Sequence, residues 1–212
     1  MSNQYDLRIK TAYQMDSVED ESEFIPLFTE DNGEINLSDI PEVLPILALR
    51  NTVLFPGVVL PITVGRQKSV KLVRSLARDK KLLGAVSQME ASIEEPEAKD
   101  LYTLGTIARV LKVLEMPDGS TSIILQGIAR FQIDKFVSSD PYFKAKVRVL
   151  TDSPINENER EFKALISSVK DYSLKIVSLT PNMPQEAGFA IKNIDNNDFL
   201  INFICSNIDL PA

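Results

Sequence analysis

The sequence predicts an α+β fold in which a β-rich unit with one helix is followed by an α-helical bundle. Two observations lead to this prediction. Runs of β-branched and aromatic residues, bounded by Pro, Gly, Asp or Ser, recur up to about residue 150. After Ser153 and Pro154 the apolar period changes from two to about 3.6 residues, which is typical of helices. We therefore expect three parts: residues 1–42, a β-rich domain over residues 43–152 and a helical subdomain over residues 153–212.

The first part is an acidic arm. Residues 1–44 hold 11 acidic and 2 basic side chains, whereas residues 45–212 hold 19 acidic and 21 basic ones, so the net charge of −7 comes from the head of the chain. The apolar residues of the arm show no sustained period, and such a segment buries too little surface to offset its ordering entropy. We predict that residues 1–42 form a mobile, solvating arm; a dedicated interaction segment is the alternative.

The β-rich domain contains five runs with strand composition, at residues 59–64, 84–89, 103–116, 120–137 and 142–150. Pro117, Asp118 and Gly119 predict a hairpin turn, because Pro presets φ and Gly tolerates a positive φ. In residues 109–114, apolar residues stand at both odd and even positions, which predicts a strand mostly covered on both faces. Residues 66–81 predict an amphipathic helix. Its buried side is expected to contain Val70, Val73, Leu76 and Ala77.

The helical subdomain begins with one long helix that ends before Pro181 and Pro184. Its apolar stripe contains Phe162, Leu165, Ile166, Val169, Tyr172, Ile176 and Leu179. Two shorter helices follow at residues 185–194 and 197–208, and the Asp195-Asn196-Asn197 turn can cap the second. Cys205 lies among apolar residues, so we expect a buried thiol. The chain stops directly after an apolar helix, which predicts truncation before a further module.

Composition argues against several classes of active site. With no histidine and one cysteine, the chain lacks the usual zinc and haem ligands and any His-assisted nucleophile. No phosphate-cradling or calcium-binding loop is present. Ser167 and Lys170 have the spacing of a serine–lysine pair, but neighbours on a solvated helix face explain it better. We therefore predict no catalytic residue, no cofactor site and no metal site in this chain.

Membrane and nucleic-acid partners are also disfavoured. The longest uncharged stretch, residues 51–65, is shorter than the roughly 20 residues of a membrane-spanning helix. Acidic residues follow Arg8 and Lys10, so no secretory signal is present and we expect a soluble, cytoplasmic protein. A basic concentration surrounds the first predicted helix, where no aromatic residue accompanies it. We interpret it as a solvated helix face, with a docking site for an acidic partner as the alternative. Its members are Arg66, Lys68, Lys71, Arg74, Arg78, Lys80 and Lys81.

An irregular apolar run offers the candidate binding site. Residues 51–61 are apolar and interrupted by prolines, which predicts a loop carrying Leu54 and Phe55. Either both side chains fold into the core, or they form an exposed patch that binds other polypeptides. The candidate contact residues are Leu54, Phe55 and Pro56, together with Met89 because methionine adapts to varied partners.

The same loop carries a family resemblance. Residues 44–72, LPILALRNTVLFPGVVLPITVGRQKSVKL, resemble the opening of the N-terminal domain of Lon, the ATP-dependent serine protease. The resemblance continues through DLYTLGTIA at residues 100–108, PDG and QGIAR at residues 117–130, and NFICS at residues 202–206. It covers about residues 43–212 and leaves the acidic arm outside.

The resemblance implies a partly closed sheet, a PUA-like pseudo-barrel, followed by a helical bundle. It also implies that the chain recognises exposed apolar segments of misfolded, damaged or short-lived regulatory proteins and supports a hexamer. In the parent enzyme an ATPase that uses ATP and Mg and a serine protease follow, and none of their residues lies in this chain. The alternatives are a stand-alone peptide-binding adaptor or regulator and an RNA-binding barrel module, the latter disfavoured by the negative net charge.

Overall fold

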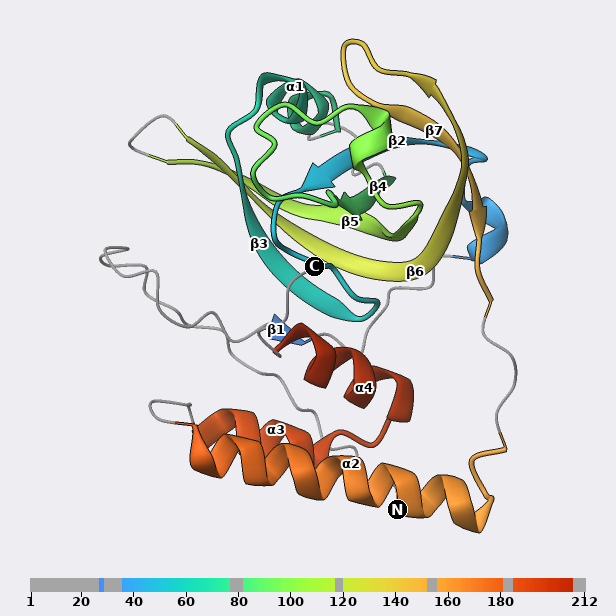
Figure 1. Ribbon diagram of the computed structural model, residues 1–212, viewed down its shortest axis with the longest axis vertical. Helices are drawn as coiled ribbons and strands as arrows, with labels where there is room; N and C mark the ends of the chain where they lie inside the picture. The colour runs from blue at the N-terminus through green and yellow to red at the C-terminus, as the bar shows by residue number, and fades with distance from the viewer. Residues whose placement is uncertain are drawn as a thin grey trace, which may run out of the picture.

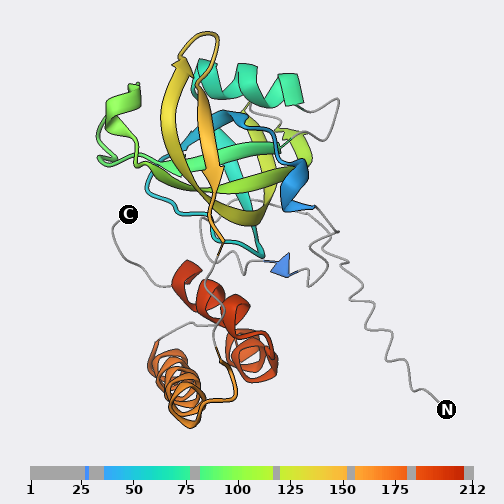
Figure 2. The same ribbon diagram turned by 90° about the vertical axis from the view of Figure 1, so that its right-hand side faces the viewer.

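The computed structural model describes residues 27–28, 36–76, 82–116, 120–151, 156–180 and 185–207. In these ranges the chain is mixed α+β, as predicted. The strands and α1 form one unit, and α4 lies between that unit and the pair of helices α2 and α3 (Figures 1 and 2). Helix α1 covers the opposite end of the strand unit from α2–α4 (Figure 1).

The elements follow the predicted order. They are β1 (Leu27–Phe28), η1 (Leu37–Asp39), β2 (Val43–Leu49), β3 (Val58–Val64), α1 (Gln67–Leu76), β4 (Leu82–Ser87), η2 (Ala98–Asp100), β5 (Leu104–Glu115), β6 (Thr121–Ser138), β7 (Lys144–Val149), α2 (Arg160–Leu179), α3 (Gln185–Asn193) and α4 (Asn197–Ser206). The five predicted strand runs correspond to β3–β7. Strand β2 had no run of its own, because it is apolar on both faces and contains Pro45.

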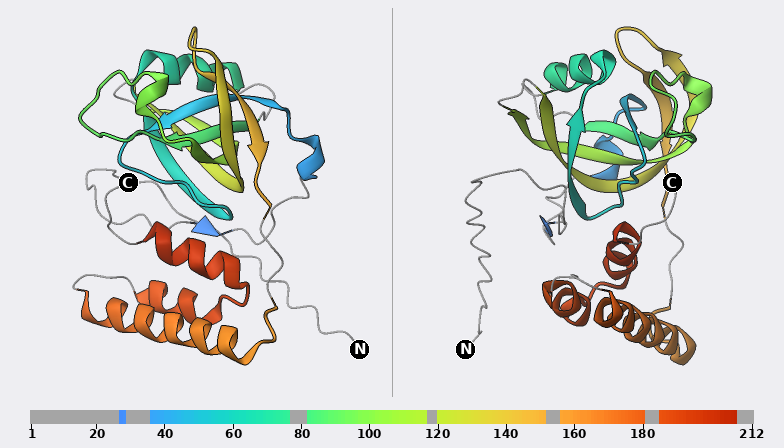
Figure 3. Two further views of the ribbon diagram at one scale, coloured as in Figure 1. Left: turned by 45° about the vertical axis from the view of Figure 1, so that its right-hand side comes forward. Right: turned by 60° about the vertical axis from the view of Figure 1, so that its left-hand side comes forward.

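The strands form one sheet in the order β1-β3-β6-β5-β4-β2-β7, and β6 also pairs with β7. Strand β2 pairs in parallel with β4, and every other pairing is antiparallel. Since β6 pairs with both β5 and β7, the pairings run from β6 through β5, β4, β2 and β7 back to β6. The sheet therefore curves around its own core (Figure 3), while its PUA-like assignment stays a prediction.

Helix α1 closes one side of the core with a face that overlaps the predicted one, because Val73 and Leu76 are buried as predicted. Leu72, Val73 and Leu76 are buried, as is Ser69, whereas Val70 is only half-buried. The buried residues recur at spacings of three, one and three, so the inward stripe is centred about one residue nearer the start of the helix than predicted. The predicted continuation through Ala77 to residue 81 lies outside the described residues.

The β5–β6 hairpin is confirmed by antiparallel pairing on both sides of the turn. Met116 N–H donates to the Ser120 carbonyl at 2.9 Å, and the turn residues 117–119 lie outside the described residues. The prediction that residues 109–114 are covered on both faces is wrong, since Leu111 is 43% exposed. Strand β4 pairs with β5 only as far as Arg109, so β6 alone flanks the remainder of β5.

The helices α2–α4 share a small core, and most of the predicted stripe of α2, apart from Ile166, points away from it. The core contains Ile191, Ile194, Leu200 and Phe203, against which α2 places Ile166, Leu174 and Val177. Of the stripe, Leu165, Tyr172, Ile176 and Leu179 are each more than half exposed. Helices α3 and α4 cover one side of α2 (Figure 3). No helix in the described part of the chain is long and apolar enough to cross a membrane.

Two further expectations concern the last helix and the arm. The cap of α4 is confirmed, because Asn196 Oδ1 accepts the Phe199 N–H at 2.8 Å. The prediction of a buried thiol is wrong: Cys205 is exposed, because it lies two positions after the inward-facing Phe203 and so points to another side of the helix. Most of the arm, residues 1–26 and 29–35, lies outside the described residues; Leu27–Phe28 pair with β3 as β1. Its mobility stays a prediction.

Candidate functional site

The predicted loop connects β2 and β3, and its first candidate residue faces the core. Leu54 is 3% exposed and packs in the core beneath α1. Its carbonyl accepts the Thr106 hydroxyl hydrogen bond at 2.6 Å. The Leu54 side chain therefore holds the loop in place and offers no surface to a partner.

Phe55 and Pro56 are half-buried and lie at a tight backbone crossing. Gly57 has a φ of +79°, which favours glycine, and its N–H donates to the Gly127 carbonyl at 3.0 Å. The Phe55 carbonyl packs directly against the Cα of Gly127, where a Cβ would overlap it. Gly127 of β6 therefore lets the loop pass close to the strand, where a residue with a Cβ would push it away.

The other side of this loop contacts α4. Asn202 Nδ2 donates to the Pro56 carbonyl at 3.1 Å. The Phe199 ring lies against Gly57, where a Cβ would approach it to 2.8 Å. The loop is therefore the junction between the strand unit and the helices, which explains why Phe55 and Pro56 are only partly accessible.

Met89, the fourth candidate, lies on an open surface at the end of β4. Residues Gln88 and Leu101 form a bridge, Met89 N–H donates to the Asp100 carbonyl at 2.8 Å, and Tyr102 N–H donates to the Ser87 carbonyl at 3.0 Å. Side chains alternate across paired strands, so Gln88 and Leu101 face inward while Met89 and Tyr102 share the outer face. Met89 is 47% exposed.

Three further apolar residues extend this surface. We call the four together the Met89 patch; they are Val53, Met89, Tyr102 and Leu104, each 40–55% exposed. The Ser87 hydroxyl donates to the Thr52 carbonyl at 2.6 Å, which brings Val53 beside the end of β4. Leu104 is the first residue of β5 and lies two positions after Tyr102 in the chain. Sequence reasoning found Met89 and missed the other three; the alternation of buried Leu101 with Tyr102 and Leu104 was the available signal.

A buried amide fixes the loop that carries Met89. Gln88 is 1% exposed, and its Nε2 donates to the carbonyls of Glu90 at 2.5 Å and Ile93 at 3.1 Å. Its Oε1 accepts from Arg66 Nη2 at 2.6 Å, and Arg66 Nε donates to the Glu94 carbonyl at 2.6 Å. Burial lowers the pKa of the Arg66 guanidinium, against which the Glu95 charge acts to raise it. These bonds hold the Met89 patch on a rigid base.

Of the two residues with the spacing of a serine–lysine pair, Lys170 has a structural role. Lys170 Nζ donates to the Ile194 carbonyl at 2.8 Å, so this lysine ties α2 to the end of α3. Ser167 is exposed beside it. In the described ranges no three Asp, Glu or Cys side chains cluster as a metal site would require.

Comparison with known proteins places the chain in a family. Residues 43–212 match the model of the ATP-dependent protease La (LON) substrate-binding domain. The chain is 47% identical to a Lon protease of Flavobacterium johnsoniae, over 100% of this chain and 26% of the relative. It is 45% identical to a Lon protease of Cytophaga hutchinsonii, over 88% of this chain and 23% of the relative. The chain thus spans about a quarter of the length of these curated relatives.

A solved structure has the same fold. The N-terminal domain of a Mycobacterium avium complex Lon protease superposes with a TM-score of 0.59 at 20% identity, over 76% of this chain and 80% of that one. The resemblance found in the loop between β2 and β3 is therefore confirmed over the strand unit and the helices together. The chain belongs to the family of substrate-binding domains of the Lon protease.

Proposed function

We propose that this chain recognises polypeptide substrates for an ATP-dependent Lon-type protease, and that the Met89 patch is its contact surface. The observation that carries the proposal is the group of four exposed apolar side chains on a backbone fixed by Gln88 and Arg66. Folded proteins bury such side chains, whereas misfolded or damaged chains expose them, so an apolar patch discriminates between the two. The family assignment does not favour the adaptor or the RNA-binding alternative.

The mechanism we propose is weak binding repeated over several copies. One small patch buries little apolar area, so a single contact releases quickly and does not trap a substrate. Several patches in one assembly raise the effective concentration for a long unfolded chain. A compact folded protein reaches fewer patches at once, which lowers its avidity.

The parent protein supplies the chemistry. We propose that it is a cytoplasmic serine endopeptidase whose ATP- and Mg-dependent module follows the present helices. The division into an arm over residues 1–42, a β-rich domain over residues 43–152 and a helical subdomain over residues 153–212 belongs to this proposal. Support comes from the family of the chain and from its coverage of only a quarter of its relatives.

Replacing Met89 by aspartate tests the patch. We expect Met89→Asp to weaken binding of a fluorescent, chemically unfolded polypeptide about tenfold, because a carboxylate would have to lose its water against apolar substrate side chains. Fluorescence anisotropy measures the affinity. The matched control is Val137→Asp, which adds the same charge at a residue of β6 with 48% exposure outside the patch.

The two variants separate contact from folding. Both should keep the circular dichroism spectrum and melting temperature of the parent chain, since surface changes cost within about 0.5 kcal/mol. Equal affinities of the Met89→Asp and Val137→Asp variants for the unfolded polypeptide would contradict the assignment of the patch.

We also propose that the chain supports assembly into a hexamer, through the exposed stripe of α2. Its residues alternate at spacings of three and four, which is the pattern of a helix seam that packs on another helix. They are Phe162, Leu165, Val169, Tyr172, Ile176 and Leu179. Four of them are more than half exposed in the single chain.

Two lysines in this stripe are expected to abolish self-association. In sedimentation equilibrium the unmodified chain should gain apparent mass with concentration, and Tyr172→Lys with Ile176→Lys should stay at the monomer mass. Phe189→Lys, on an exposed position of α3 outside the stripe, is the control and should behave as the unmodified chain. A constant monomer mass for the unmodified chain would rule out this role of the stripe.

A further inference from the structure

A strand edge that the proposed function does not use runs along β3. Strand β3 pairs with β6 on one side over residues 59–64, whereas on its other side β1 pairs only with Val58 and Val59. In the described part of the chain, no further strand pairs with residues 60–64 on that side. Such an edge presents unpaired backbone N–H and carbonyl groups, which pair readily with other chains.

Pro61 shows which backbone groups point toward this edge. It lies opposite Ile124 in an uninterrupted register with β6, although proline has no N–H to donate. Its missing donor therefore faces away from β6, as is usual for proline in a sheet. Because backbone groups alternate in direction along a strand, Val59 and Thr63 also point their N–H and carbonyl groups to the open side. The Thr63 N–H has no acceptor there among the described residues.

The pairing of β1 defines how the chain before it would continue along β3. Leu27 lies opposite Val59, and the two strands run antiparallel. Residue numbers fall on one antiparallel strand as they rise on the other, so the same register sets residues 26 to 22 opposite residues 60 to 64. The segment directly before β1 therefore matches the open edge of β3 in length and direction.

The residues of this segment suit the positions that the register gives them. Pro26 would lie opposite a residue of β3 whose backbone groups point to β6, so its missing N–H would cost no hydrogen bond. Phe24 would lie opposite Ile62, which packs against the core beneath α1 and is only half-buried. Glu23 would lie opposite Thr63, which is exposed. An apolar residue thus meets the core side and a charged one meets solvent.

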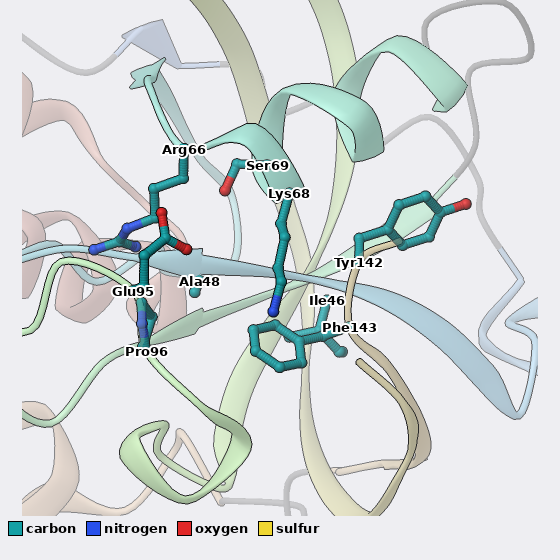
Figure 4. A pocket seen from close by; sticks show the side chains of 9 residues that line it. All are labelled: Ile46, Ala48, Arg66, Lys68, Ser69, Glu95, Pro96, Tyr142 and Phe143. Carbon is teal, nitrogen blue, oxygen red and sulfur yellow. The ribbon is translucent and has the colours of Figure 1, made fainter. Parts of the chain in front are cut away.

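Charge favours the same placement. Residues 19–21 are Glu-Asp-Glu, and the register carries them past the end of β3, where α1 begins after two further residues. Helix α1 has three cations and no acidic residue. Of these cations, the Lys68 Nζ lies 5.1 Å from the centroid of the Phe143 ring (Figure 4), whereas no described carboxylate pairs with Lys71 or Arg74. Carboxylates near these cations and the helix N-terminus are favourable.

We propose that the open edge of β3 is the docking site of residues 19–26 of the same chain. Residues 22–26 extend β1 along β3, so that the Thr63 N–H donates to the Glu23 carbonyl, and residues 19–21 lie against the start of α1. The docked segment covers an edge that would otherwise pair with unfolded substrates or with a second copy. The acidic arm is then an interaction segment, the alternative that the sequence left open.

Amide hydrogen exchange of the 212-residue chain, followed by NMR, tests the strand at the Thr63 N–H. We expect this N–H to exchange about tenfold faster in Glu23→Pro than in the unmodified chain, because proline cannot donate to β3 and its ring displaces the segment. Ser22→Pro is the matched control and should keep the slow exchange, since residue 22 would point its N–H away from β3. The Ile62 N–H, which faces β6, should stay slow in all three proteins and so reports that the fold is intact.

Two triple variants test the contribution of charge. The first removes the acidic residues before β1: Glu19→Gln, Asp20→Asn and Glu21→Gln. The second, the matched control, removes three acidic residues after β1: Glu30→Gln, Asp31→Asn and Glu34→Gln. We expect the first to speed exchange of the Thr63 N–H about threefold and the second to leave it unchanged, because only residues 19–21 would face the cations of α1. Equal effects of the two variants would overturn the contact with α1.

Other occupants of the edge would give different results. Fast exchange of the Thr63 N–H in the unmodified chain would overturn the proposal, and so would slow exchange that survives Glu23→Pro. Protection that grows with protein concentration would assign the edge to a second copy, and protection that requires an added unfolded polypeptide would assign it to substrate; either result would exclude the arm. The affinity of Met89→Asp for unfolded polypeptide tests the Met89 patch independently of these results.

Discussion

Phe131→Ala is expected to lower the free energy of unfolding by about 4 kcal/mol, the largest effect of any single truncation considered for this chain. Phe131 on β6 is 0% exposed and belongs to the core cluster with Ile46, Val86 and Ile107. Its ring fills the space that Gly84 on β4 and Gly105 on β5 leave open, where a Cβ would approach it to 2.6 Å and 2.9 Å. Alanine would leave a cavity between three strands that the glycines cannot fill.

Urea denaturation followed by circular dichroism measures this loss. The control is Phe189→Ala, which makes the same truncation on α3 at a residue with 71% exposure and should change stability by less than about 0.5 kcal/mol. Similar midpoints for the two variants would show that the strand core closes around the missing ring, contrary to the expected cavity.

The fold could be predicted from the sequence wherever apolar residues recur at a regular spacing. The strands β3–β7 and the helices α2–α4 were predicted within a few residues, because alternation and the proline and glycine boundaries mark them locally. Periodicity could not decide which apolar face of α2 is buried. The helix has two such faces, one through Leu165 and Tyr172 and one through Ile166 and Val177, and only the position of α3 and α4 separates them.

The site was less predictable, because its residues meet only through tertiary contacts. Leu54 and Phe55 are adjacent in an apolar loop, and the sequence left open whether their side chains face inward. The Thr106 hydrogen bond to the Leu54 carbonyl and the contact of the Phe55 carbonyl with Gly127 fix the loop, and the Leu54 side chain lies in the core. Met89 was found by residue type, but its neighbour Tyr102 is brought beside it by the pairing of Gln88 with Leu101.

Gly127→Ala should destabilise the chain by about 3 kcal/mol and loosen the junction with the helices. A Cβ at this position would overlap the Phe55 carbonyl, and backbone cannot yield as a flexible side chain would. The loop would have to move away from β6, which breaks the Gly57 N–H bond to the Gly127 carbonyl and disturbs the Asn202 bond to Pro56. The effect therefore spreads from the strands to α4.

The melting temperature and limited proteolysis measure both parts of this prediction. About 3 kcal/mol corresponds to a fall of roughly 6–12 °C for a chain of this size, and cleavage in the segment between β7 and α2 should accelerate as α4 separates from the loop. Gly65→Ala is the matched control, because nothing lies within 4 Å of a Cβ there. An equal loss of stability in both variants would show that the effect comes from replacing any glycine and not from the contact between Gly127 and the Phe55 carbonyl. A loss confined to Gly127→Ala, without faster cleavage, would mean that the Phe199 and Asn202 contacts hold α4 even when the loop shifts, so that the junction depends on the helices more than on β6.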